Sequence, residues 1–197
     1  MAEYLTIAAP AEAQYTDKRS RFLAFAMPVR DAAEARAAVA DLQRRYHDAR
    51  HVCWAYMLGS ARTDFLNNDN GEPSGTAGKP ILGQINSLGL TDVLVAVVRY
   101  FGGIKLGTSG LIVAYRTAAR MALEAAPAVV CHDMARITFH FPYAAMNDAM
   151  KLTRDFDVTV VDRQFDNTCR MTLDIDADTA PRLRARIDSI DGATIAD

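Results

Sequence analysis

Residues 93–110 read VLVAVVRYFGGIKLGTSG and combine three kinds of local structure in one stretch. The β-branched run Val93–Val98 is typical of a buried strand. Four glycines follow between residues 102 and 110 and predict a tight loop. Beyond the loop, apolar residues recur at helical spacing at Leu111, Tyr115, Ala118 and Ala122. The stretch therefore predicts a buried strand, a glycine-rich loop and a long amphipathic helix in immediate succession.

A second glycine-rich stretch, residues 69–80, reads DNGEPSGTAGKP. It ends a polar segment, residues 62–79, that is dense in Asn, Asp, Gly and Ser and is expected to be one long loop. Small residues let such a loop turn tightly, so that its backbone N–H groups can point at a ligand. Pro80 is expected to open a short helix that stops at Gly89.

Three further elements are predicted upstream of these loops. Residues 22–27 and 51–58 are typical of strands. Between them, Asp31 and Glu34 have the spacing of a capping box and predict a helix start. The expected apolar face of that helix consists of Ala35, Val39, Leu42 and Tyr46.

The last third of the chain has its own pattern. Apolar residues alternate with polar ones in residues 136–141 and 169–175, which predicts half-buried strands, and Pro142 is expected to start a helix. The pair Asp166-Asn167 suits a turn. The full order is strand, helix, strand, strand, helix, strand, which is the ferredoxin-like pattern. We therefore expect an α+β chain with two domains, residues 1–130 and 131–197, joined near residues 126–133.

Composition excludes several classes of protein. The chain has 197 residues, half of them hydrophobic, and a net charge of −2, so it is neither disordered nor strongly basic. Its three cysteines form no C-x-x-C pair, its first 20 residues do not resemble a secretory signal, and its longest apolar run is too short to span a bilayer. These features predict a cytoplasmic protein without a membrane partner.

The charge is unevenly distributed along the chain. Residues 1–130 carry a net charge of +2 and residues 131–197 a net charge of −4. Between Lys79 and Arg120 there are five basic residues and one acid, Asp92. Arg116 and Arg120 are four residues apart and share one helical face. This basic stretch predicts a local surface for phosphates, with a merely solvated surface as the alternative.

A strand that leads through a glycine loop into a helix N-terminus is an arrangement that binds anions. Thr108 or Ser109 is expected to cap that helix, with Lys105 supplying charge. No lysine follows Gly107 as a Walker A loop requires, and a G-x-G-x-x-G fingerprint is also missing. The predicted nucleic-acid or anion-binding residues are Lys79, Arg99, Tyr100, Gly102, Gly103, Lys105, Gly107, Thr108, Ser109 and Arg116. The predicted motif loop consists of Gly71, Glu72, Ser74, Gly75, Thr76 and Gly78.

Hydrolytic and metal chemistry are not favoured by the sequence. Ser74, His51 and Asp69 can be named as a triad, but no G-x-S-x-G elbow surrounds the serine. His47 and His51 are followed by no metal-ligand cluster. We therefore predict no catalytic residue, no metal site and no cofactor.

The two glycine-rich strings, residues 71–80 and 98–107, resemble those of the IMPACT family in its bacterial YigZ-type form. Weaker similarities occur at residues 18–22, at Ala49-x-His51 and at residues 110–115. The chain departs from the family pattern at Asn70, where many relatives carry an acid, and at Val113, where many carry a base.

This resemblance implies an N-terminal domain like the second domain of small-subunit ribosomal protein five. It also implies a C-terminal ferredoxin-like domain similar to the last domain of elongation factor G. Eukaryotic relatives regulate translation through protein contacts, and bacterial members are proposed to bind RNA or the ribosome.

Three hypotheses of function follow. The first is a non-enzymatic regulator that binds RNA or the ribosome through the basic, glycine-rich surface. The second is a protein–protein regulator of a translation or stress-response factor. The third is a protein that binds a small phosphorylated ligand or nucleotide in the strand–loop–helix segment.

Overall fold

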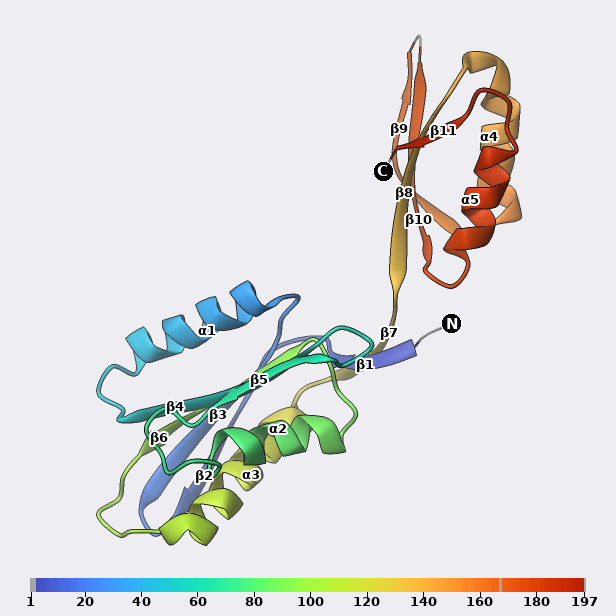
Figure 1. Cartoon of the computed structure of the whole chain (residues 1–197). Helices are drawn as coiled ribbons and strands as arrows, with labels where there is room; N and C mark the ends of the chain where they lie inside the picture. Colours follow the sequence, from blue (N-terminus) through green and yellow to red (C-terminus); the bar gives the residue numbers. More distant parts are fainter. Residues whose placement is uncertain (1–2, 167, 197) are drawn as a thin grey trace. The chain divides into compact units, whose positions relative to one another are not determined.

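The computed structural model describes residues 3–166 and 168–196 and has a mixed α/β structure (Figure 1). Its internal contacts divide the chain into two compact units, one spanning residues 4–131 and the other containing the residues from His132 onward. The turn predicted at Asp166-Asn167 includes Asn167, which lies outside the described residues. Within the described ranges, none of the helices combines the length and the apolar character that crossing a bilayer requires.

The first unit is built on a five-stranded antiparallel sheet with the strand order β2-β3-β6-β4-β5. A smaller sheet pairs β1 with β7. The strands are β1 (Glu3–Ile7), β2 (Ala11–Asp17), β3 (Ser20–Pro28), β4 (His51–Leu58), β5 (Asp64–Asn68), β6 (Val93–Tyr100) and β7 (Ala128–His132). The helices are α1 (Ala32–Arg45), α2 (Gly78–Ser87) and α3 (Gly107–Ala125).

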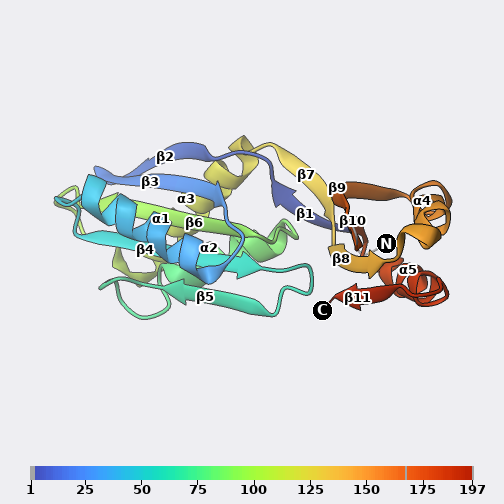
Figure 2. The ribbon, with the colours of Figure 1, turned by 90° about the horizontal axis from the view of Figure 1, so that it is seen from above.

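Helices cover both faces of the larger sheet: α1 lies on one face, and α2 and α3 lie on the other (Figures 1 and 2). The central strand β6 is buried on both sides. Val93, Val95 and Val97 pack with α2 and α3, whereas Leu94, Ala96 and Val98 pack in the clusters on the α1 side. This double burial explains why the strand is a continuous apolar run instead of an alternating one.

The predicted elements around β6 are confirmed. Asp31 is the N-cap of α1, and its carboxylate accepts a hydrogen bond of 2.8 Å from the Glu34 N–H. The helix buries Ala35, Val39 and Leu42, as predicted from their spacing. The strand predicted at residues 51–58 has the bounds of β4.

Two local expectations were wrong. The segment 62–79 is not a single loop, because Asp64–Asn68 forms the edge strand β5 on β4. The α3 helix begins at Gly107 after Leu106, and neither Thr108 nor Ser109 caps it by a side-chain hydrogen bond in the described part of the chain.

The second unit contains one antiparallel sheet with the strand order β11-β8-β10-β9. Its core includes Phe139, Phe141, Met171, Leu173 and Leu183. The strands are β8 (Met134–Phe141), β9 (Val158–Phe165), β10 (Cys169–Asp176) and β11 (Thr194–Ala196). The helices are a short 3₁₀ turn (Tyr143–Ala145), α4 (Met146–Asp155) and α5 (Ala180–Asp188). The predicted order of strands and helices is confirmed.

Candidate functional site

The two glycine-rich segments border two separate hollows in the first unit. One, the α2–α3 groove, has a volume of about 810 Å³ and lies between the two helices. The other, the glycine-loop cavity, has a volume of about 390 Å³ and lies between residues 72–73, the ends of β4 and β6, and the start of α3. The basic residues predicted to act together are therefore divided between two places.

The α2–α3 groove contains two of the predicted phosphate-binding residues, Lys79 and Arg116. Arg120 lies one helical turn beyond Arg116 and also lines the groove. Its guanidinium forms an ion pair of 2.7 Å with Glu124, and both side chains are about half exposed. The groove thus has three cationic side chains and one carboxylate along its walls.

The glycine-loop cavity contains Arg99, Lys105, Gly107 and Thr108 from the predicted set, together with Glu72 of the motif loop. Arg99 was predicted to contact phosphates. Instead, its Nη1 lies 2.5 Å from Oε1 of Glu72, and the two side chains are 8% and 4% exposed. Side chains alternate along a strand, so Arg99 points to the same face as Val97, toward the core beneath α2 and α3.

The remaining predicted residues are placed differently. Tyr100 donates a hydrogen bond of 2.8 Å to Asp48 and packs beneath Arg21, so it does not line either hollow. A Cβ on Gly102 would lie 2.0 Å from the backbone carbon of Arg19, which makes this glycine a packing requirement. Gly75 of the motif loop lines the groove. Neither hollow is lined by the other predicted residues, which are Gly71, Ser74, Thr76, Gly78, Gly103 and Ser109.

A buried polar network adjoins the glycine-loop cavity through Glu72 and Arg99, which line it. Oε1 of Glu72 accepts hydrogen bonds from Arg99 and from the Tyr115 hydroxyl, the latter at 2.8 Å. The Tyr115 hydroxyl oxygen lies 3.3 Å from Sγ of Cys53, which is also 2.9 Å from the backbone carbonyl oxygen of Asp69. Burial raises the pKa of Tyr115, and the nearby Cys53 and Glu72 raise it further. The network therefore keeps the phenol protonated and fixes Glu72 in place.

The loop of residues 69–78 is organised around the carboxylate of Asp69. It accepts hydrogen bonds of 2.8–3.0 Å from the backbone N–H groups of Gly75, Ala77 and Gly78. Burial acts to raise the pKa of Asp69, but these three donors and the charge of Lys79 hold it below its ordinary value. Asp69 therefore caps the start of α2 by direct hydrogen bonds, although it precedes Gly78 by nine residues in the sequence.

The arrangement does not form the triad considered from the sequence. The Asp69 carboxylate is occupied by backbone N–H groups, and Nδ1 of His51 lies 2.8 Å from the backbone carbonyl oxygen of Asn70. Neither contact joins the histidine to the aspartate. Among residues 3–166 and 168–196, no group of three or more His, Cys, Asp or Glu side chains is arranged to hold a metal ion.

Cys53 is expected to be unreactive in the folded protein. Burial raises the pKa of its thiol to about 12, so at pH 8 only about one molecule in ten thousand carries the thiolate that attacks an alkylating agent. At pH 10 the fraction rises to about one in a hundred. With iodoacetamide at pH 8, mass spectrometry should find the partly exposed Cys131 modified at least about a hundred times faster than Cys53. Equal rates in the native state would contradict the burial, and denaturant should abolish the difference.

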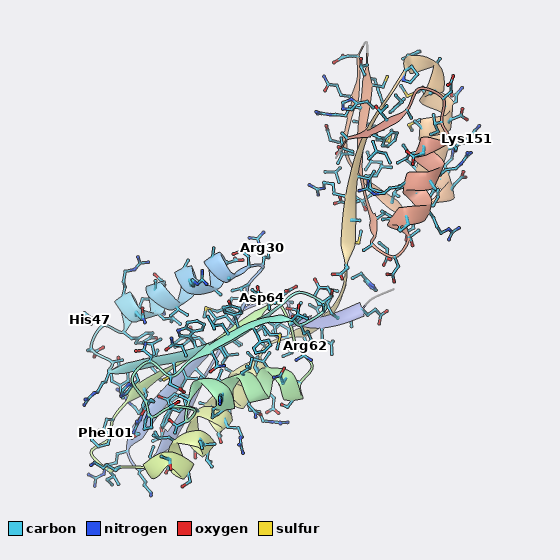
Figure 3. All side chains as sticks on the ribbon, viewed as in Figure 1. Arg30, His47, Arg62, Asp64, Phe101 and Lys151 are labelled. Carbon is cyan, nitrogen blue, oxygen red and sulfur yellow. The ribbon has the colours of Figure 1, made fainter. Side chains whose placement is uncertain are left out.

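Sequence reasoning missed Arg50 and the cavity-facing role of His51, both of which line the glycine-loop cavity. The register of the sheet brings them to Arg99, because His51 pairs with Arg99 across β4 and β6. Phe101 follows β6 directly, at the end of the sheet where the chain turns into α3 (Figure 3). The sequence contains no signal for the pairing of β4 with β6.

Comparison with known proteins adds an independent finding. Residues 18–123 match the family model described as the Impact N-terminal domain. The chain is 32% identical over 182 residues to a Haemophilus influenzae protein named IMPACT family member, an alignment that covers 91% of this chain and 88% of that protein. It is 39% identical over 128 residues to Escherichia coli IMPACT family member YigZ, covering 63% and 62% of the two chains. A crystal structure described as that of a hypothetical protein superposes with a TM-score of 0.76 at 28% identity, over 99% of this chain and 97% of that one.

Proposed function

The chain belongs to the IMPACT family in its YigZ-type form, and from that premise we propose that it binds RNA, free or in the ribosome, in the α2–α3 groove. The site lies in the N-terminal domain, taken as residues 1–130. The protein acts in the cytoplasm as a non-enzymatic component of translation control. The link to translation rests on the family resemblance, and the choice of the groove rests on its charge.

The charge of the groove is the observation that carries this proposal. The whole chain has a net charge of −2, which repels a polyanion. Among its described lining residues, the groove instead presents Lys79, Arg116 and Arg120 against a single carboxylate, Glu124. Local positive potential supplies most of the sequence-independent affinity for a phosphate backbone.

The one acid in the groove does not cancel this charge. Arg120 and Glu124 are each about half exposed, and an exposed ion pair of this kind contributes about 1 kcal/mol or less. Arg120 can therefore exchange the carboxylate for a phosphate at little cost. Gln84, Ser87 and Thr117 also line the groove and add hydrogen-bonding groups for sugar or phosphate oxygens.

The second unit supports the expected likeness to translation proteins. Its antiparallel strand order β11-β8-β10-β9, with a helix in each crossover, is what we expect of a ferredoxin-like domain at residues 131–197. We propose the likeness of the first domain to the second domain of small-subunit ribosomal protein five on the resemblance alone.

Reversing two charges in the groove should weaken RNA binding. In Lys79→Glu/Arg116→Glu, we expect the dissociation constant for a structured RNA to rise at least about tenfold at physiological salt, because two phosphate contacts are lost. The slope of log affinity against log salt should become shallower by about 1.4–1.8, at about 0.7 per phosphate in a single strand and about 0.9 per phosphate in a duplex. Filter binding at several salt concentrations measures both quantities.

A matched variant separates the groove from the total charge. Arg30→Glu/Arg44→Glu makes the same change in net charge, but these exposed residues lie at or in α1, on the opposite face of the sheet. Its affinity should stay within about twofold of the wild type. Equal weakening in both variants would mean that only the total charge matters, and a wild-type protein without affinity at low salt would refute RNA binding. A partner complex that survives nuclease would instead favour the protein–protein alternative.

A further inference from the structure

The glycine-loop cavity is separate from the groove proposed to bind RNA, and its lining residues are typical of a ligand-binding site. Its volume of about 390 Å³ lies near the lower end of the range for small-molecule pockets. Arg50, Lys105 and Thr108 line it together with the apolar residues Leu106 and Leu111. A space of this size suits one nucleotide and is too small for a longer segment of a strand.

The start of α3 faces this cavity and leaves backbone donors unused. The helix is 19 residues long and begins at Gly107, and no side chain of the described residues caps its first N–H groups. Gly107 and Thr108, the first two helical residues, both line the cavity. Free N–H groups and the helix dipole favour an anion at this position.

A second observation in the cavity wall points to the same kind of ligand. The Arg99 side chain is more than nine-tenths buried, and its Nε has no hydrogen-bond partner among the described residues. Arg99 lines the cavity, and its Nη1 is occupied by Glu72. Its Nε is too deeply buried for a ligand in the cavity to reach, so the guanidinium acts on an anion there through its charge and not through that nitrogen.

The charges around the cavity suit a doubly charged anion. Glu72 is the one carboxylate among the described lining residues, and it is taken by Arg99 and Tyr115. Arg50 and Lys105 remain as two exposed cations, beside His51, whose Nδ1 contacts the Asn70 carbonyl oxygen. A phosphate monoester carries a charge of about −1.5 to −2 at neutral pH, whereas a phosphodiester inside a strand carries −1. The balance therefore favours a terminal phosphate over an internal one.

The rim of the cavity offers a surface for a planar ring. Phe101 is 55% exposed, and the Arg99 guanidinium carbon lies 5.7 Å from the centre of its ring. The Arg99 guanidinium makes a cation–π contact with the Phe101 ring. More than half of the Phe101 surface remains exposed to solvent. Aromatic side chains in this situation stack on nucleobases without regard to sequence.

We propose that the glycine-loop cavity binds a nucleoside 5′-monophosphate, with the phosphate at the start of α3 beside Lys105 and Arg50 and the base on Phe101. This chemical group has two sources, a free mononucleotide and the phosphorylated 5′ end of an RNA strand. The second source rests on the proposed RNA function, and the first does not.

Titration calorimetry measures the affinities of AMP, adenosine and inorganic phosphate for the whole chain, and the three affinities are compared. It also compares two RNA oligonucleotides of one sequence that carry a 5′-phosphate or a 5′-hydroxyl. The proposal expects AMP to bind at least about tenfold more tightly than either of its parts, or the 5′-phosphorylated RNA to bind at least about fivefold more tightly than its 5′-hydroxyl form. Lys105→Glu should abolish this preference and Phe101→Ala should reduce it; both residues are exposed, so neither change threatens the fold.

The groove variant Lys79→Glu/Arg116→Glu is the control, because it should weaken both RNAs equally and leave the preference for a 5′-phosphate intact. If wild-type protein binds AMP no better than adenosine and binds both RNAs equally, the cavity proposal is overturned while RNA binding stands. If AMP binds and neither RNA does, the cavity proposal stands and the RNA function fails. A preference that persists in Lys105→Glu would also overturn the assigned position of the phosphate.

Discussion

Replacing Glu72 with glutamine should lower the free energy of unfolding by about 3–5 kcal/mol. The substitution keeps the shape of the side chain and an oxygen that can accept from Tyr115, but it removes the charge that faces Arg99. Both side chains are more than nine-tenths buried, so the guanidinium is left in the interior without a counter-charge. Urea unfolding followed by circular dichroism measures the change.

Two further variants test this explanation. Glu72→Gln/Arg99→Met removes both charges while keeping the acceptor for Tyr115, and it should recover at least half of the lost free energy. Glu124→Gln breaks the exposed pair with Arg120 and should cost no more than about 1 kcal/mol. A Glu72→Gln protein as stable as the wild type would show that the pair is not buried in solution.

Gly102→Ala should destabilise the protein by about 3 kcal/mol or more, for a steric reason. The added Cβ would lie 2.0 Å from the Arg19 carbonyl carbon and 2.3 Å from Ser20 N. These are backbone atoms, so they cannot rotate away, and the loop after β6 must separate from the turn before β3. The hydrogen bond from Gly102 N–H to Oγ of Ser20, 3.2 Å long, would be lost with it.

Gly83→Ala is the matched control for this substitution. Gly83 lies inside α2, and a Cβ there would meet no described atom within 4 Å other than those of its chain neighbours and its own helical backbone. Because alanine loses less backbone entropy than glycine in a helix, this change should stabilise the protein by about 0.5–1 kcal/mol. Urea midpoints that fall for Gly102→Ala and rise for Gly83→Ala would fit this account. A Gly102→Ala midpoint equal to that of the wild type would contradict the close approach.

The parts of the fold that were predictable are those with a strong pattern. The apolar run of β6, the Asp31 cap of α1 and the alternation in β8 and β10 each gave the right element. The edge strand β5 gave no such pattern, because four of its five residues are exposed and burial imposes no alternation on them. Its strand conformation comes from pairing with β4, which local sequence does not encode.

The sequence predicted which segments form the candidate site, but it did not predict which side chains contact each other there. Both glycine-rich segments border it, and Lys79, Arg116 and Lys105 line its hollows. Arg99 could have been placed correctly, since it continues the alternation of Val95 and Val97 into the core. Its pairing with Glu72 was not accessible, because the two residues are 27 positions apart and meet only through the tertiary structure. The division of the cations between two hollows has the same origin.

The pairing of β1 with β7 determines how the first unit can be rearranged or inserted into another protein. The Ala8 N–H donates to the Pro127 carbonyl oxygen at 2.8 Å, so the chain enters and leaves the first unit at one spot. A unit whose two ends lie close together can be inserted into a loop of another protein with little disturbance of its interior. For the same reason it can be circularly permuted, with a short linker joining the present ends and new termini opened in an exposed loop.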